Sequence, residues 1–149
     1  MVGTRGCYKH RLLVSVERVS RYTRLSLMPD ALPWTVAHQL QKDLLCSEKW
    51  PVLSLTVDRG CEFAHLPDVL ERGRLFVCDP QRPNQRGTNE NTIGLVRQYI
   101  PKGQPLSLQT PESIARIELL LNSRPRACLG FRTPAEVLFA THHRCRDSN

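Results

Sequence analysis

The sequence predicts a mixed α/β domain, in which helices cover both faces of a sheet. The first observation is the order of the apolar segments, which alternate between strand-length runs and runs with helical spacing. The second is composition: 149 residues, 40% hydrophobic and 23% charged, suit one domain with a buried core. The third is that no apolar run approaches the roughly 20 residues of a membrane-spanning helix, so we expect no membrane partner.

Two strands are predicted near the N-terminus, where they form a hairpin. Leu12–Glu17 and Tyr22–Met28 are β-branched or alternate between apolar and polar residues, and the polar segment Arg18–Arg21 joins them. Upstream, Val2–Gly6 has the pattern of the end of an earlier strand that enters a glycine-rich turn. We therefore expect the sheet to begin before Met1.

A helix, a strand and a second helix are predicted next. An amphipathic helix is expected from Pro33 to about Cys46, where apolar residues recur at helical spacing. Val52–Val57 is a continuous apolar run, typical of a strand buried on both faces. A helix shortened by Pro67 follows over Glu62 to about Arg72. Its expected apolar face consists of Phe63, Leu66, Val69 and Leu70.

The rest of the chain adds one strand and three helices. Arg74–Cys78 predicts a short strand, and the loop Asp79–Arg86 leads from it into a helix that carries Glu90. Thr110 is expected to cap a further helix with Pro111 in its first position. The apolar stripe of that helix consists of Ile114, Ile117, Leu120 and Leu121. A last, short helix after Thr133-Pro134 is expected to bury Val137 and Leu138.

Charge and cysteine usage limit the class of partner and compartment. Lys and Arg number 21 against 14 Asp and Glu, which gives a net charge of +7 and a pI near 9.4. Such a surface attracts nucleic-acid phosphates regardless of base sequence, although basic proteins without that role are common. The six cysteines occur singly, with no CxxC pair, and no signal peptide is evident, so we expect a reducing cytoplasm. Cys78, in an apolar run, is expected in the core.

Two acids are candidates for a metal site. Functional groups in open α/β sheets gather at the carboxyl ends of strands, and Asp58 directly follows the run Val52–Val57. Glu90 follows with 31 residues between them, on the predicted helix. Carboxylates from separate elements suit Mg²⁺ or Mn²⁺, which can activate a water or hydroxyl in phosphodiester chemistry. Asp58 is also compatible with a plain turn or helix-capping role.

The helix that carries Glu90 also offers a phosphate contact. Arg97 lies seven residues after Glu90, hence within about 20° of it around the helix axis. Arg97 could therefore meet a phosphate near a metal held by Glu90. Leu95, Val96 and Tyr99 fall on the opposite side, where they are expected to pack on the sheet. An ordinary Glu–Arg surface pair explains the same spacing equally well.

Three segments resemble the transposases of the insertion-sequence-thirty family. They are Thr56–Ala64 (TVDRGCEFA), Cys78–Gly103 with its GTNEN and RQYIPKG sequences, and Leu121–Val137 (LNSRPRACLGFRTPAEV). Leu13–Tyr22 is also similar to the second and third strands of that family. The resemblance implies a ribonuclease-H-like fold, the DDE catalytic core of retroviral integrases, over residues 1–140, with a polar tail at 141–149.

The resemblance also implies a site and its partners. Asp58 corresponds to the second acid of the catalytic triad and Glu90 to the third, and both would bind Mg²⁺ or Mn²⁺. Arg86, Arg97 and Lys102 are candidate phosphate contacts to DNA, as transposon end and as target. A bacterial cytoplasmic location follows, with the nucleoid as the location of the DNA-bound form.

Three departures from the family pattern are visible. Arg59 stands where the family has Asn after the second acid, and RPNQRG at Arg82–Gly87 replaces SPWQRG. The first catalytic Asp and the helix-turn-helix region of the family lie upstream of the segment matching Val2–Gly6. We therefore expect an N-terminally truncated chain, with its first strand largely missing, that is catalytically inactive by itself.

Three hypotheses follow. The first is a truncated DDE transposase domain for metal-dependent DNA strand cleavage and transfer. The alternative is a non-catalytic DNA-binding or oligomerising fragment, which associates with itself or with intact transposase. The third is a chain that does not fold stably, because loss of a central strand leaves its neighbours with unpaired edges.

Overall fold

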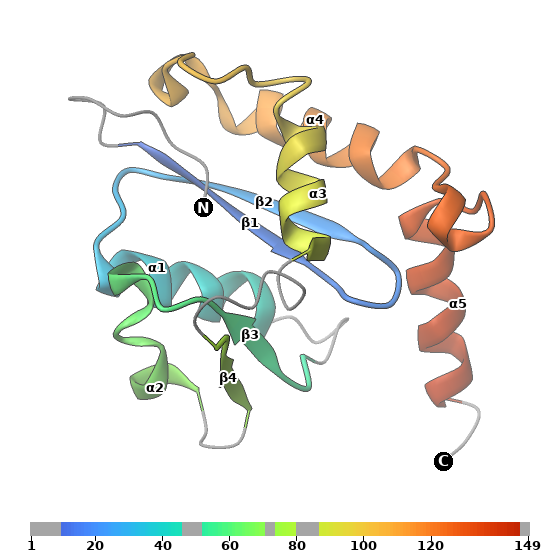
Figure 1. Cartoon of the computed structure of the whole chain (residues 1–149), viewed down its shortest axis with the longest axis horizontal. Helices are drawn as coiled ribbons and strands as arrows, with labels where there is room; N and C mark the ends of the chain where they lie inside the picture. The colour runs from blue at the N-terminus through green and yellow to red at the C-terminus, as the bar shows by residue number, and fades with distance from the viewer. Residues whose placement is uncertain (1–9, 46–51, 71–73, 80–86, 147–149) are drawn as a thin grey trace.

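The computed structural model describes residues 10–45, 52–70, 74–79 and 87–146 (Figure 1). The strands are β1 (Arg11–Val16), β2 (Thr23–Met28), β3 (Leu55–Val57) and β4 (Leu75–Val77). The α-helices are α1 (Pro33–Leu40), α2 (Leu66–Val69), α3 (Gly87–Val96), α4 (Pro111–Ser123) and α5 (Pro134–Arg146). The predicted order of strands and helices is confirmed. The expected strand remnant Val2–Gly6 lies outside the described residues.

β1 and β2 form the predicted antiparallel hairpin, with Arg11 opposite Met28 and Val16 opposite Thr23. The turn between the two strands is stabilised by hydrogen bonds of Glu17. The Glu17 carboxylate accepts hydrogen bonds from the backbone N–H groups of Val19 and Ser20, and the Glu17 N–H donates to the carbonyl of Tyr22 at 2.8 Å. The acid in this turn is therefore used as a hydrogen-bond acceptor within the turn.

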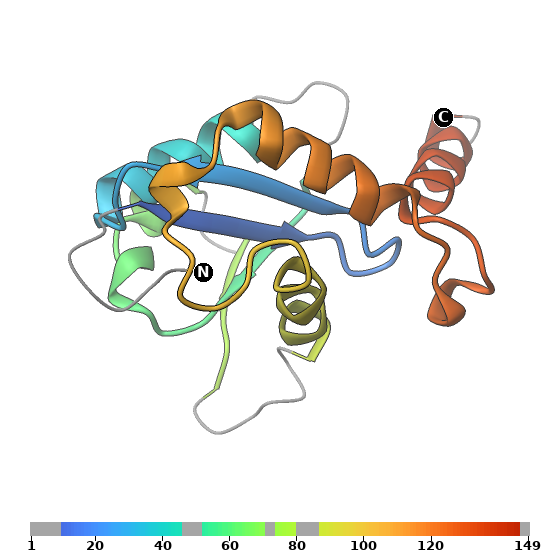
Figure 2. The same cartoon turned by 90° about the horizontal axis from the view of Figure 1, so that it is seen from above.

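Both faces of the hairpin are buried, because β1 alternates its side chains between two apolar clusters. Leu12 and Val14 belong to a cluster with residues of α3 and α4. Leu13, between them, belongs to a second cluster with residues of α1, β3 and α2. Alternate residues of a strand point to opposite faces, so helices cover both sides of this hairpin (Figures 1 and 2). The predicted α/β architecture is confirmed.

β3 and β4 form a parallel pair, with Leu55 opposite Leu75 and Val57 opposite Val77. The expectation that Val52–Val57 is buried on both faces is wrong. Val57 is buried, but Thr56 is exposed and Leu53 is 83% exposed. The reason is that β3 pairs only with β4 in the described part of the chain, and α1 and α2 pack on its Val57 side alone.

The helices match their predicted types but not all of their predicted lengths. α1 continues into a π-helical turn over Gln41–Leu45. The helix predicted from Glu62 divides into a 3₁₀ turn at Cys61–Phe63 and the single turn of α2, as Pro67 indicated. α5 runs for 13 residues to Arg146 and so is not the short helix expected. No helix among the described residues has the length and apolarity needed to cross a membrane.

α4 carries the predicted capping box, in which Thr110 and Ser113 exchange backbone and side-chain hydrogen bonds. Its apolar stripe is Ile114, Ile117 and Leu121, all buried. Leu120, which was expected in that stripe, is 44% exposed. Positions 118 and 122 face the sheet instead, and both are polar.

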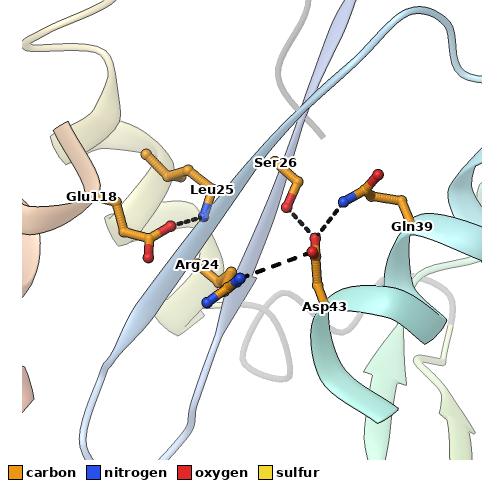
Figure 3. A network of polar contacts seen from close by, with 6 residues as sticks. All are labelled: Arg24, Leu25, Ser26, Gln39, Asp43 and Glu118. Carbon is orange, nitrogen blue, oxygen red and sulfur yellow. Dashed lines mark hydrogen bonds and ion pairs between the residues drawn. The ribbon is translucent and has the colours of Figure 1, made fainter. Parts of the chain in front are cut away.

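Polar side chains of α4 close the outer edge of β2. The Asn122 side chain accepts a hydrogen bond from the Thr23 N–H and donates one to the Thr23 carbonyl, both at 2.8 Å and both buried. Glu118 accepts from the Leu25 N–H at 2.7 Å. From the other side of β2, Asp43 accepts hydrogen bonds from Ser26 and Gln39 (Figure 3). β2 is thus held by polar contacts on both sides.

We predict that Asn122→Ala destabilises the domain by about 2–4 kcal/mol, because it leaves a buried N–H and a buried carbonyl of Thr23 without partners. Urea unfolding measures this change. Ser123→Ala, an exposed neighbour on the same helix, serves as the control and should change stability by less than about 0.5 kcal/mol. An equal effect of both substitutions would contradict the role given to Asn122.

Glu118 should give the domain a pH-dependent stability. Burial disfavours its charged form and raises the pKa of Glu118, an effect that outweighs the Leu25 hydrogen bond. A raised folded-state pKa contributes stability below the unfolded pKa, and that contribution is lost as pH rises through the folded pKa. Glu118→Gln stays neutral and keeps an acceptor for Leu25. The Tm of this variant relative to that of the wild type should therefore increase as pH rises from about 4 to about 7.

Glu112 provides the control for this pH series. Hydrogen bonds from its own backbone N–H and from Thr110 lower the pKa of Glu112, so its contribution has the opposite sign: it is present above the unfolded pKa and lost as pH falls. Glu112→Gln should therefore lose Tm relative to the wild type over the same rise in pH. The same trend in both variants would show that Glu118 is not the source.

Candidate functional site

Asp58 lies where the sequence placed it, directly after β3. Its side chain is half-buried, and its Oδ1 accepts a hydrogen bond from the Gly60 N–H at 2.9 Å. The carboxylate therefore stabilises the turn that follows the strand, which is the turn role that the sequence also allowed for Asp58. The adjacent Cys78 N–H donates to the Val57 carbonyl at 2.8 Å, which ties the end of β3 to β4.

The parallel pairing places a second acid at the same edge. Asp79 follows β4 by two residues, at the carboxyl end of the strand paired with β3. It is exposed. The sequence shows that Asp79 directly follows the predicted strand Arg74–Cys78. Only the register of β3 and β4, however, shows that Asp58 and Asp79 lie at the same edge of the pair.

Glu90 lies in the first turn of α3 and is exposed. The opposite side of this helix packs as predicted: Val96 is fully buried, and Leu95 and Tyr99 are partly buried against the same cluster. The apolar contacts therefore fix the helix so that Glu90 faces solvent.

The predicted phosphate contacts differ in their surroundings. The Arg97 N–H donates to the Ile93 carbonyl at 3.0 Å, so the helical hydrogen bonding of α3, which carries Glu90 in its first turn, continues to Arg97. Its side chain is partly exposed, and that of Lys102 is exposed in the following loop. Arg86 lies outside the described residues. Among the residues that the structure does describe, no group of three or more His, Cys, Asp or Glu side chains is arranged to hold a metal ion.

The first turn of α3 is tied to the β1–β2 hairpin. The Arg21 guanidinium donates a hydrogen bond to the Thr88 hydroxyl, two residues before Glu90. Arg21 has φ = 62°, a left-handed conformation that few non-glycine residues adopt. Local sequence patterns do not predict this contact, because Arg21 and Thr88 are 67 positions apart.

Comparison with known proteins connects these observations. The chain is 39% identical over 135 residues to the transposase InsI for insertion sequence element IS30A of Escherichia coli, covering 89% of this chain and 35% of the transposase. It is 40% identical over 127 residues to the transposase for insertion sequence element IS1086 of Cupriavidus metallidurans, covering 84% of this chain and 38% of that protein. The chain thus spans little more than a third of the length of these curated relatives. No protein-family model matches it.

The fold has a counterpart among solved structures. The catalytic core domain of BIV integrase superposes with a TM-score of 0.64 at 18% sequence identity, covering 95% of this chain and 99% of that one. By sequence, the chain is therefore a relative of the IS30-family transposases over about a third of their length, and its fold is the ribonuclease-H-like fold of a retroviral integrase catalytic core.

Proposed function

We propose that this chain is part of a DNA transposase catalytic domain, with DNA phosphodiesters as its substrate class. The observation that carries the proposal is the similarity to IS30-family transposases over 89% of the chain. Asp58 and Glu90, the two acids that match the family triad, both lie at element ends, one after β3 and one in the first turn of α3. A bacterial cytoplasmic location, at the nucleoid when bound to DNA, belongs to the same proposal.

Asp58 and Glu90 are the residues that would hold a divalent cation. Their donor atoms are carboxylate oxygens, the ligands that Mg²⁺ and Mn²⁺ prefer, so the residue types fit the metal. When bound, the metal would polarise a phosphodiester and stabilise the charge that develops on its oxygens. Glu90 is exposed and available to a ligand, whereas Asp58 would keep its hydrogen bond to Gly60 through one oxygen.

The basic residues would position the DNA. Arg97, about two turns after Glu90, and the exposed Lys102 would each neutralise a backbone phosphate. Arg86 remains a candidate from the sequence alone. Such contacts fix the orientation of DNA without specifying its base sequence. The net charge of +7 supports this assignment.

The second candidate function is a non-catalytic DNA-binding or oligomerising fragment. The features that favour it are the net charge of +7 and the basic side chains of Arg97 and Lys102, at and after the end of α3. In this case the protein would occupy DNA, or associate with itself or with intact transposase, without cleaving a strand. Both candidates require DNA binding, and they differ in catalysis.

We predict that the purified 149-residue chain binds duplex DNA with an affinity that falls steeply as salt concentration rises. Neutralising phosphates releases counterions, and each contact adds about 0.9 to the slope of log K against log salt. Fluorescence anisotropy over a salt series measures the slope. Negligible binding at every salt concentration would refute the assignment of DNA as partner.

We predict weak Mn²⁺ binding by this chain and no strand transfer, because two carboxylates bind the cation but do not complete a three-acid site. Electron paramagnetic resonance follows free Mn²⁺, and a strand-transfer assay on labelled DNA follows catalysis. Asp58→Asn and Glu90→Gln should each reduce Mn²⁺ binding, while Glu136→Gln, at an exposed acid of α5, should not. Strand transfer that Asp58→Ala abolishes would make the chain an active enzyme and overturn this prediction.

A further inference from the structure

Three arginines gather where the β1–β2 turn meets the end of α4. Arg21 lies in the turn, and Arg124 and Arg126 lie in the loop between α4 and α5. Figures 1 and 2 both show that turn beside this loop. The paired hydrogen bonds between Thr23 and Asn122, both at 2.8 Å, join the end of the turn to the end of α4, two residues from Arg21 and two residues from Arg124. Residues separated by about a hundred positions thus form one basic cluster, which we call the arginine cluster.

Arg126 is the buried member of the cluster. Arg126 is only 9% exposed, and its Nη2 donates a hydrogen bond at 3.3 Å to the carbonyl of Leu121, near the C-terminal end of α4. A helix C-terminus is a favourable place for a cation. Its Nε, however, is buried without a hydrogen-bond partner in the described structure. Burial is the main cause that lowers the pKa of Arg126; among the smaller causes, Cys128 opposes this shift, whereas Arg124 and Arg21 add to it.

The two outer members have only neutral partners. Arg21 donates to the Thr88 hydroxyl, and Arg124 donates to the Gln98 side-chain carbonyl at 3.3 Å. None of the three arginines forms an ion pair with a carboxylate of the described residues. The acid at the start of the turn, Glu17, accepts hydrogen bonds from the N–H groups of Val19 and Ser20.

The cluster is also held in place before any ligand arrives. The Arg126 N–H donates to the Arg132 carbonyl, and the Arg126 carbonyl accepts from Leu129 and Phe131, so the loop is fixed at Arg126. The hydrogen bonds of Glu17 fix the turn that carries Arg21. Like charges that are held together without an anion cost free energy in the unbound state. A phosphate placed between them would remove that cost.

We propose that the arginine cluster is a binding site for a phosphate of the DNA backbone. Arg21 and Arg124 contact the phosphate. Arg126, which is buried, positions the loop and adds its positive electrostatic potential. This inference rests on the proposed function and adds a contact that the acids, Arg97 and Lys102 do not supply. Because Arg21 also bonds Thr88, the site joins bound DNA to the helix turn that carries Glu90.

The test measures how DNA affinity depends on salt for matched variants of the full chain. Arg124→Gln and Arg21→Gln should each lower the slope of log K against log salt by about 1, the value for one lost phosphate contact. Arg116→Gln is the control, since Arg116 is an exposed arginine of α4 outside the cluster, and it should leave the slope unchanged. Arg126 stays intact in all variants because it is buried.

Arg21→Lys separates charge from folding. It keeps the charge but cannot reproduce the guanidinium fork, so a retained slope with an unchanged Tm supports a charge contact. Slopes for Arg21→Gln and Arg124→Gln that equal the wild-type slope would refute the cluster as a DNA site and leave the proposed function standing. If the wild-type chain binds no DNA at any salt concentration, the proposed function and this inference both fail.

Discussion

The contact on which the rest of the structure depends is the sealing of β2 by α4. The N–H groups of Thr23 and Leu25 point away from β1 and would otherwise be an open strand edge, a template for pairing with another chain. Asn122 and Glu118 satisfy them. The spacing explains why a helix can do this: two residues of a strand span about 6.8 Å and four residues of a helix rise about 6 Å. One turn of α4 therefore matches two residues of β2, and the two elements must run alongside each other.

That alignment decides what else α4 buries and where it ends. With Glu118 and Asn122 turned to the strand edge, Ile114, Ile117 and Leu121 face the cluster shared with β1 and α3, and Leu120 is left exposed. The last residues of α4 then reach the β1–β2 turn, so Arg124 and Arg126 are placed beside Arg21. The packing of the hairpin, and not any local sequence feature, brings the basic residues together.

Local sequence patterns predicted most of the elements, and pairings between distant residues account for the failures. Thr110 and Pro111 predicted the start of α4 because capping is local chemistry. The run Val52–Val57 predicted a strand buried on both faces because its residues are mostly apolar. Its burial depends, however, on which strands and helices pack against it. For the site, Asp58 and Glu90 could be chosen from their positions at element ends and from the family likeness. The Arg21–Thr88 bond and the Asp58–Asp79 edge could not, because each depends on strand register or on a contact across the fold.

The acids and bases of this chain are used for different purposes, and this division links stability to function. Three acids of the described structure accept hydrogen bonds from backbone N–H groups: Glu17 in the turn, Glu118 at the strand edge and Glu136 at the start of α5. Asp43, by contrast, forms an ion pair with Arg24 at 4.0 Å. A carboxylate that accepts from backbone stabilises the fold but is less available to neutralise an arginine. The arginine cluster is one place where the guanidinium groups form no ion pair with a carboxylate of the described residues. Under the proposal made above, the phosphates of bound DNA would supply the anionic partners that these arginines lack.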